Sequence, residues 1–430
     1  MPKYKVSLDV TNIKNFVYDM EHCIKCKGCT WVDHIYMPGI NFSTKCPSAT
    51  KEIYDSYGAY GKMRIGLGMV NGKLQYSDEL LKILYECTLC GACDVGCKRN
   101  LDLEIELTLE ALRIKAVKDG AGPMPQHKKI AENIANTHNR YGAKHEQRHN
   151  WLPAGIKPAA KADILYFPGC AASYRHKEIA QSTAKILQKS QTPFTMLTDE
   201  WCCGNLLYSV GMIDEARELA KRNIEAIKAT GAKILMTSCA ECYRMIKVDY
   251  PKILGIATAD LGFEVIHLVE LVDRLIRENK IKFTNSIDLR LHYHDSCSLS
   301  RQSEPWKPWE GERGLWGVVT PSVERRRGTN GIYDLPREIL TSIPGIKLAE
   351  GIRKRENAWC CGAGRGAKDA FPEFAQWTAE QKLIEIKEVG AEAVTATCPY
   401  CKENMATVVG LSNENIKVMD FSEIIAQAIA

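Results

Sequence analysis

Eighteen cysteines constrain what this chain can fold into more than any other feature of its sequence. Four of them form two vicinal pairs, in the stretches EWCCGN at 200–205 and AWCCGA at 358–363. Adjacent Cα atoms across a trans peptide lie about 3.8 Å apart, whereas a disulfide prefers about 4.4–6.8 Å. A vicinal pair is therefore a poor disulfide, and its recurrence in one chain indicates a different use for the thiols.

The composition is that of an ordinary globular protein, and the length allows two to four domains. The chain has 430 residues, with 45% hydrophobic and 25% charged residues, and its net charge of +5 is spread among mixed signs, which argues against nucleic-acid binding. Neither a transmembrane span nor a signal peptide is visible. We therefore expect a cytoplasmic protein, peripheral to a membrane only through a partner subunit. In that reducing compartment, so many cysteines are expected to bind metal.

The first eight cysteines form two clusters, CIKCKGC followed by CP, and CTLCGACDVGC. Three cysteines at successive two-residue gaps can wrap one face of an iron cube, and in two-cluster ferredoxins the fourth ligand comes from the other motif. This rule predicts two cubane [4Fe-4S] sites. The first would use Cys23, Cys26, Cys29 and Cys97, and the second Cys87, Cys90, Cys93 and Cys46.

Zinc is the alternative for these motifs, but it prefers two separated CxxC pairs to overlapping triplets. Two details depart from the bacterial ferredoxin pattern. Sixteen residues separate Cys29 from Cys46, and Cys97 is followed by lysine in place of proline. We expect the interval 30–45 to form a loop that covers the cluster with aromatic side chains, with His34 as a packing or surface residue.

The remaining chain is an internal repeat. A strand-like DILYFPGC ends at Cys170, and LRLHYHDSC ends at Cys297. Each copy continues with WCCG, an amphipathic helix and a strand that leads into CxxC, in GAKILMTSCAEC at 231–242 and GAEAVTATCPYC at 390–401. These last stretches align at a constant offset of 159. Alternating strands and helices predict an α/β unit in each copy, with the cysteines at strand ends and turns.

Each repeat contributes five cysteines, so that eight plus ten accounts for all 18. Five converging thiolates indicate either an unusual cluster or a cubane beside a free reactive cysteine, and spacing does not choose between these. The two sets are Cys170, Cys202, Cys203, Cys239 and Cys242, and Cys297, Cys360, Cys361, Cys398 and Cys401.

The duplicated CCG and CxxC arrangement, preceded by two ferredoxin-like motifs, resembles the catalytic-subunit family of heterodisulfide reductase over almost the whole chain. Related subunits occur in redox complexes of sulfate reducers and in class II benzoyl-CoA reductase complexes. The resemblance implies that both five-cysteine sets hold noncubane [4Fe-4S] clusters. These would clamp and split a disulfide such as CoM-S-S-CoB, with electrons arriving from the two cubanes. It also implies a flavin-containing or cytochrome-type electron-donor subunit as partner and a disulfide or thiol small molecule as substrate.

Two alternatives remain at this stage. The chain could be an electron-relay subunit of a larger complex without its own substrate, or the iron–sulfur subunit of a glycolate or lactate oxidation system. No flavin or nicotinamide motif is visible. The GAGRG stretch at 362–366 lacks the strand–turn–helix context and the downstream acid of a nucleotide site.

The predicted fold class is α/β, with a helical ferredoxin-like domain at 1–120, a connector at 121–160 and tandem pseudo-symmetric CCG domains at 161–285 and 286–430. A Trp-, Pro- and Gly-rich insertion at about 303–328 is expected to be a surface loop that covers the site, docks a partner or packs on itself. Arg365 could steady a cluster or face solvent. His292, His294 and Asp295 could supply hydrogen bonds or a proton near Cys297, but a structural role is favoured for them.

Overall fold

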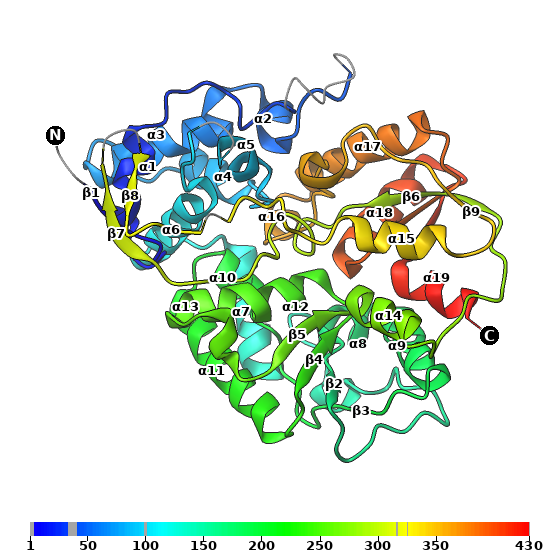
Figure 1. Ribbon diagram of the computed structural model, residues 1–430. Coiled ribbons are helices and arrows are strands. Elements are labelled where there is room, and N and C mark those ends of the chain that lie inside the picture. Colours follow the sequence, from blue (N-terminus) through cyan, green and yellow to red (C-terminus); the bar gives the residue numbers. More distant parts are fainter. Residues whose placement is uncertain (1–3, 33–40, 99–100, 315–316, 325, 430) are drawn as a thin grey trace.

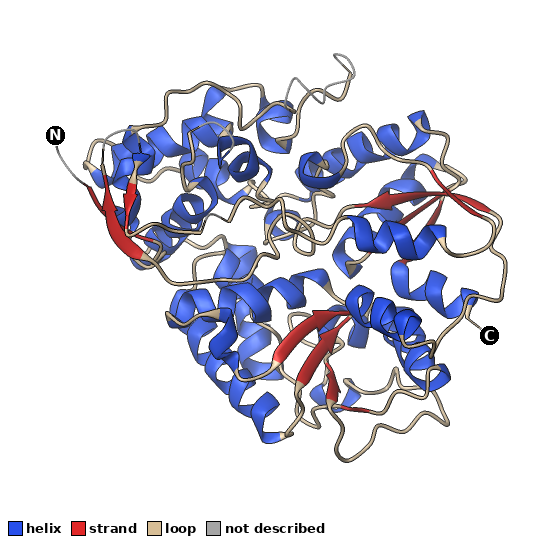
Figure 2. Cartoon of the chain, in the orientation of Figure 1, coloured by secondary structure: helices blue, strands red, loops and turns tan. Residues whose placement is uncertain are grey.

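The computed structural model describes residues 4–32, 41–98, 101–314, 317–324 and 326–429. The chain forms three parts that meet near its centre, an N-terminal helical part and two α/β parts (Figure 1). Helices predominate around short parallel sheets (Figure 2), which confirms the predicted mixed α/β class. The expected cover at 33–40, including His34, lies outside the described residues.

The N-terminal part is built from short helices that pack around α6 (Ile105–Lys118), most of whose side chains are buried. Helix α4 shows how the sequence starts these helices, since Ser77 accepts a hydrogen bond from the Leu80 amide at 3.2 Å. The elements are β1 (Tyr4–Ser7), α1 (Val17–Glu21), α2 (Pro47–Glu52), α3 (Ala59–Val70), α4 (Asp78–Tyr85), α5 (Ala92–Lys98) and α6 (Ile105–Lys118), followed by α7 (Pro125–Thr137).

Two four-stranded parallel sheets carry the repeat. Their strand orders are β3-β2-β4-β5 and β9-β6-β10-β11, which are the same topology with β9, β6, β10 and β11 in place of β3, β2, β4 and β5. The first sheet contains β2 (Ile164–Tyr166), β3 (Phe194–Thr195), β4 (Ile234–Thr237) and β5 (Glu264–His267). The second contains β6 (Leu289–His294), β9 (Ile346–Leu348), β10 (Ala393–Ala396) and β11 (Lys417–Asp420).

The helices repeat as well. The stripe of α11 buries Ala216 and Ala220, and that of α17 buries Ala375 and Ala379, as their spacing predicts. The first part has α8 (Gly169–Tyr174), α9 (Lys177–Lys189), α10 (Asn205–Ser209), α11 (Ile213–Ala229), α12 (Ala240–Arg244), a π-helical turn (Met245–Asp249), α13 (Tyr250–Leu254) and α14 (Leu268–Arg277). The second has α15 (Asp334–Thr341), α16 (Ala367–Ala370), α17 (Pro372–Glu388), α18 (Pro399–Ser412) and α19 (Phe421–Ala428).

The two α/β parts pack against each other reciprocally. Helix α19 of the second part lies on α9 of the first, and α14 of the first lies on α15 of the second. Helices α19 and α14 each follow the last strand of their sheet, so equivalent elements make both contacts. The repeat is therefore a pseudo-symmetric pair, which places the two CxxC turns near its centre.

The insertion differs from the expected surface loop. It forms β7 (Glu310–Arg313) and β8 (Val319–Thr320), and β7 pairs antiparallel with β1 from the N-terminal part (Figure 1). Trp306, which lies within the stretch expected to be a surface loop, is only 3% exposed. The hairpin thus fastens the second α/β part to the N-terminal part. Among the described helices, none combines the length and apolarity needed to cross a membrane.

Candidate metal centres

The first ferredoxin-type site gathers the thiols of two distant segments. Cys23, Cys26, Cys29 and Cys97 line one small cavity with Tyr60 and Ile105. Lys25 and Lys27 have φ of 58° and 63°, so the backbone between the cysteines repeatedly enters the left-handed region as it winds around the cavity. Burial raises the pKa of the Cys97 thiol to about 12.

The second ferredoxin-type site is built in the same way. Cys46, Cys87, Cys90 and Cys93 line a second cavity, and Cys46 lies at the N-terminus of α2. Burial, together with the neighbouring thiols of Cys87, Cys46 and Cys90, raises the pKa of Cys93 well above its usual range.

Both four-thiol sets fit iron–sulfur clusters. All 18 cysteines are free of disulfides, and except for the exposed Cys26 these thiols are buried or half-buried. Buried thiolates so close together repel one another, and a soft metal ion supplies the missing positive charge. The chemistry of the donors therefore suits iron–sulfur clusters.

The first CCG site consists of Cys170, Cys202, Cys203, Cys239 and Cys242, all buried. The Sγ atoms of Cys203 and Cys242 are 3.4 Å apart, and the Gly204 amide donates to the Cys202 Sγ at 3.4 Å. Gly204 has φ of 79° and is the N-cap of α10, while Cys239 is the N-cap of α12. Helix N-termini favour negative charge, so these turns suit thiolates.

The second CCG site repeats this geometry. Cys297, Cys360, Cys361, Cys398 and Cys401 line one cavity with Ser296, Ser298, Glu241, Tyr400 and Thr88. The Gly362 amide donates to the Cys360 Sγ at 3.3 Å, and Cys398 is the N-cap of α18. A ring nitrogen of His294 lies within 4.8 Å of the sulfurs of Cys361 and Cys401. Burial beside Cys398 raises the pKa of Glu241 to about 8.

The two CCG sites meet at their CxxC turns. The Ala240 amide donates to the Thr397 carbonyl at 3.2 Å, and these residues adjoin Cys239 and Cys398 in the chain. His267 also hydrogen-bonds the Thr397 carbonyl, at 3.1 Å from its Nε2. The ten CCG cysteines therefore form two adjoining sets, one from each repeat.

The second ferredoxin-type site adjoins the second CCG site. Cys90 and Ala92 pack against Cys360, with Cys297 beside them. Arg301 bridges the contact, because its Nε donates to the Cys90 carbonyl at 2.6 Å and its Nη1 to the Ala358 carbonyl at 2.7 Å. The structure thus brings the expected thiols into four sets, three of which lie next to one another in the order second ferredoxin-type, second CCG and first CCG.

Several buried arginines at these sites were missed by the sequence analysis. Arg148 donates to Glu200 at 2.7 Å and lies 3.7 Å from the Cys170 Sγ, and Glu200 also accepts from the Gly169 amide. Glu200 directly precedes WCCG in the sequence. An acidic residue next to a cysteine pair could therefore have indicated a buried basic partner at this site. Arg365, left undecided between cluster and solvent, is buried and donates to Ser298 at 2.9 Å.

The other two candidates in the strand before Cys297 have structural roles. The His292 Nδ1 hydrogen-bonds the Ala349 carbonyl at 2.9 Å. The carboxylate of Asp295 is held by two bonds of 2.7 Å from Arg337. Both residues lock the end of β6 to the segment that follows the insertion.

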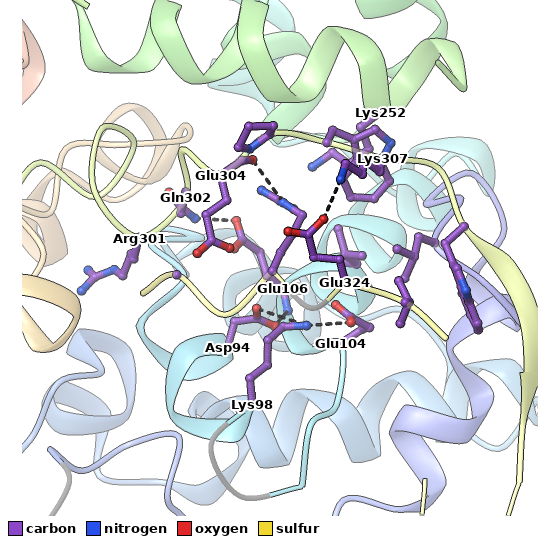
Figure 3. Close-up of a pocket in the computed structure, with 18 of the residues that line it drawn as sticks. Asp94, Lys98, Glu104, Glu106, Lys252, Arg301, Gln302, Glu304, Lys307 and Glu324 are labelled. Atoms are coloured by element: carbon purple, nitrogen blue, oxygen red, sulfur yellow. Dashed lines mark hydrogen bonds and ion pairs between the residues drawn. The ribbon is translucent and has the colours of Figure 1, made fainter. Parts of the chain in front are cut away.

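A charged pocket of about 170 Å³ lies where the insertion meets the other parts (Figure 3). Its charges pair with each other, at 2.6 Å between Lys98 and Glu104 and at 2.6 Å between Lys307 and Glu324. Glu106 links the N-terminal part to Arg244 of the first α/β part at 2.9 Å and to Gln302. This network clamps the three parts together around the ferredoxin-type sites.

The fold and the cysteine sets define an iron–sulfur oxidoreductase subunit. Residues 19–101 match the 4Fe-4S dicluster domain family, and residues 164–247 and 323–406 match the cysteine-rich CCG domain family. The second CCG match begins after Cys297. The strand register nevertheless makes β6, which leads to Cys297, the counterpart of β2 in the first repeat.

Comparison with individual relatives is more specific than the family models. The D-type subunit of the dihydromethanophenazine:CoB–CoM heterodisulfide reductase from Methanosarcina acetivorans is 33% identical, over 100% of this chain and 99% of its own length. The B-type subunit of a CoM/CoB fumarate reductase from Methanothermobacter marburgensis is 27% identical over 80% of this chain and 61% of its own length. The EtfAB:quinone oxidoreductase of Syntrophomonas wolfei is 25% identical over 98% of this chain and 60% of its own length. The chain belongs to the heterodisulfide reductase catalytic-subunit family.

Proposed function

We propose that this chain is the iron–sulfur subunit in which electrons pass from two ferredoxin-type [4Fe-4S] clusters to two noncubane clusters that reduce a disulfide. The ligands would be the four cysteine sets described above. When bound, the clusters would supply one-electron transfer and iron atoms that can bind the sulfur atoms of the substrate. The net reaction takes a disulfide, two electrons and two protons to two thiols.

The observation that carries the proposal is the junction of the two CCG sites at their CxxC turns, where Ala240 and His267 of the first α/β part hydrogen-bond the Thr397 carbonyl of the second. Two complete five-thiol sites side by side suit a substrate with two sulfur atoms. The contact of Cys90 with Cys360 supports entry of electrons at the second CCG site. The name of the Methanosarcina acetivorans relative contains both the CoB–CoM heterodisulfide and dihydromethanophenazine, which favours that substrate class and that donor.

The surrounding residues serve this chemistry by exclusion and charge. Nine of the ten CCG cysteines are buried and Cys297 is half-buried, so bulk water is largely kept from the sulfurs. Arg301 and Arg365 place buried positive charge beside the second CCG site, and the Arg148 Nη2 donates to the Cys170 Sγ of the first at 3.7 Å. An electron-donor subunit with flavin or haem is the expected partner, since no flavin or nicotinamide motif is visible in this chain.

The test is anaerobic reconstitution followed by iron analysis and activity. We expect about 16 iron atoms per chain and oxidation of a reduced viologen dye by CoM-S-S-CoB. About 8 iron atoms would contradict the noncubane clusters. A fully loaded chain that leaves the disulfide untouched would point to the relay role in a larger complex.

A further inference from the structure

The two CCG sites are not identical, and the strand register shows where they differ. Tyr166 on β2 pairs with Met236, and Tyr293 on β6 pairs with Thr395. Met236 and Thr395 are related by the repeat offset of 159, so Tyr166 and Tyr293 are equivalent. One residue further along, Phe167 in the first repeat corresponds to His294 in the second, and Cys170 likewise corresponds to Cys297.

His294 is placed to act on the thiols of its own site. Its side chain is 1% exposed, and a ring nitrogen lies within 4.8 Å of both the Cys361 and the Cys401 sulfur. The imidazole and the Cys361 thiol are thus buried neighbours, close enough for the ring to turn a nitrogen towards the sulfur. Its Nδ1 has no hydrogen-bond partner among the described residues. Phe167, at the equivalent place in the first site, is fully buried and has no polar atom to offer.

The second site also has more unneutralised positive charge beside it than the first. At the first site Arg148 is neutralised by Glu200, with 2.7 Å between Nη2 and Oε1. At the second site Arg301 and Arg365 donate to carbonyl, hydroxyl and amide oxygens, and within the described ranges neither forms an ion pair with a carboxylate. The Arg301 Nη2 and the Arg365 Nε and Nη1 are buried and have no hydrogen-bond partner among the described residues.

We propose that His294 donates a ring N–H to the sulfur of Cys361 and thereby makes the second CCG site easier to reduce than the first. The inference rests on the proposed assignment of iron–sulfur clusters to these sites. A hydrogen bond to a ligating sulfur withdraws electron density from it and stabilises the reduced cluster. His294 is thus a positioning residue that separates two otherwise matching sites, and it favours the site beside Cys90 as the first acceptor.

The experiment uses the full chain, reconstituted anaerobically, with potentials measured by redox titration followed by electron paramagnetic resonance. His294→Phe installs the residue of the first site, and His294→Gln retains an N–H donor. Phe167→His is the reciprocal control. We expect His294→Phe to keep about 16 iron atoms and to lower the midpoint potential of one CCG cluster. His294→Gln should return part of that shift, and Phe167→His should raise the potential of the other cluster.

A second readout is made on the wild type, so it can overturn the proposal even where a variant loads poorly. In protein labelled with ¹⁵N-histidine, pulsed resonance should detect a weak nitrogen coupling that His294→Gln abolishes. A wild type without this coupling overturns the proposal, as does a fully loaded His294→Phe variant with unchanged potentials. A coupling of the strength of a direct iron–nitrogen bond also overturns it, in favour of histidine ligation. Wild type with only about 8 iron atoms would instead refute the proposed function itself.

Discussion

Arg301 donates from its Nε to the carbonyl oxygen of Cys90 at 2.6 Å and so joins the start of the second α/β part to the second ferredoxin-type motif. Its Nη1 reaches the Glu356 and Ala358 carbonyls at 3.0 and 2.7 Å, and the residue is only 5% exposed. One planar guanidinium therefore holds both sides of the contact between Cys90 and Cys360.

Arg301→Lys should destabilise this junction, because a single ammonium cannot reach the same set of carbonyls. We expect a loss of about 3 kcal/mol, given the strength of charged hydrogen bonds to buried groups. The measurement is the apparent melting temperature of the loaded chain. Arg277→Lys, at a side chain 73% exposed, is the matched control and should change it little. Equal melting of Arg301→Lys and wild type would contradict this role of the guanidinium.

The pairing of the ferredoxin-type ligands can be tested by additivity. If Cys23 and Cys97 hold one cluster, the double variant Cys23→Ala/Cys97→Ala should lose about four iron atoms, as each single variant does. Cys23→Ala/Cys46→Ala should lose about eight, because those thiols line separate cavities. If instead Cys23→Ala/Cys97→Ala loses about eight iron atoms and Cys23→Ala/Cys46→Ala about four, Cys46 and Cys97 must be exchanged between the two sites.

Gly169 is required by the first CCG site. It has φ of +74°, and a Cβ there would lie 2.7 Å from the Cys242 Sγ. Gly169→Ala should therefore displace that thiol and lose about four iron atoms from the loaded chain. Gly155→Ala is the control, since Gly155 has φ of +91° but nothing within 4 Å of its Cβ position. If both variants retain all their iron, the close approach at Gly169 does not matter for assembly.

The parallel α/β repeat could be predicted from the sequence because equivalent strands and helices are separated by the same number of residues as the matching sequence motifs. The offset of 159 reappears in β4 and β10, which begin at Ile234 and Ala393, and in the helices before them. The cysteine groups likewise gather as their spacing indicates, although their role as ligands stays a prediction.

Contacts between distant segments could not be predicted in this way. Arg301 meets Cys90 across 211 residues, and no local pattern marks either residue for the other. The insertion was misjudged for the same reason. Its β7 segment, EGER, has no apolar alternation, and it becomes a strand only because β1 offers an edge. Tertiary pairing, not propensity, decides such a strand.

His127 should make the fold sensitive to mild acid. It is fully buried, with its Nε2 at 2.8 Å from the Gly366 carbonyl, and burial lowers its pKa from 6.5 to about 4. The unfolded chain therefore takes up a proton first as pH falls. The stability is present above about pH 6.5 and is lost towards pH 4, at up to about 1.4 kcal/mol per pH unit.

His127→Gln, which retains a donor for Gly366, should remove this slope. Melting curves of both proteins between pH 7.5 and 5.5 give the comparison, with the wild type losing more stability below pH 6.5. Tyr85, Arg113, Arg140 and Asp369 surround His127 in both proteins and act as a common background. Parallel curves would show that another group governs the acid response.

The insertion should depend on the buried ion pair of Arg313 on β7 and Asp19 on α1, whose charged atoms are 3.2 Å apart. Burial raises the pKa of Asp19 to about 6, and the charge of Arg313 opposes that rise. Arg313→Met should leave the acid without its partner, at a cost of about 3–5 kcal/mol. Limited proteolysis within 303–328 and the apparent melting temperature are the measurements.

A second substitution separates charge from packing. Asp19→Asn in the Arg313→Met background removes the uncompensated carboxylate and should recover part of the lost stability. Lys307→Ala is the matched control, because the side chains of Lys307 and Glu324 are 71% and 77% exposed and such a surface pair contributes about 0–1 kcal/mol. Should Arg313→Met resist protease like wild type, the hairpin would be held by its pairing with β1 alone.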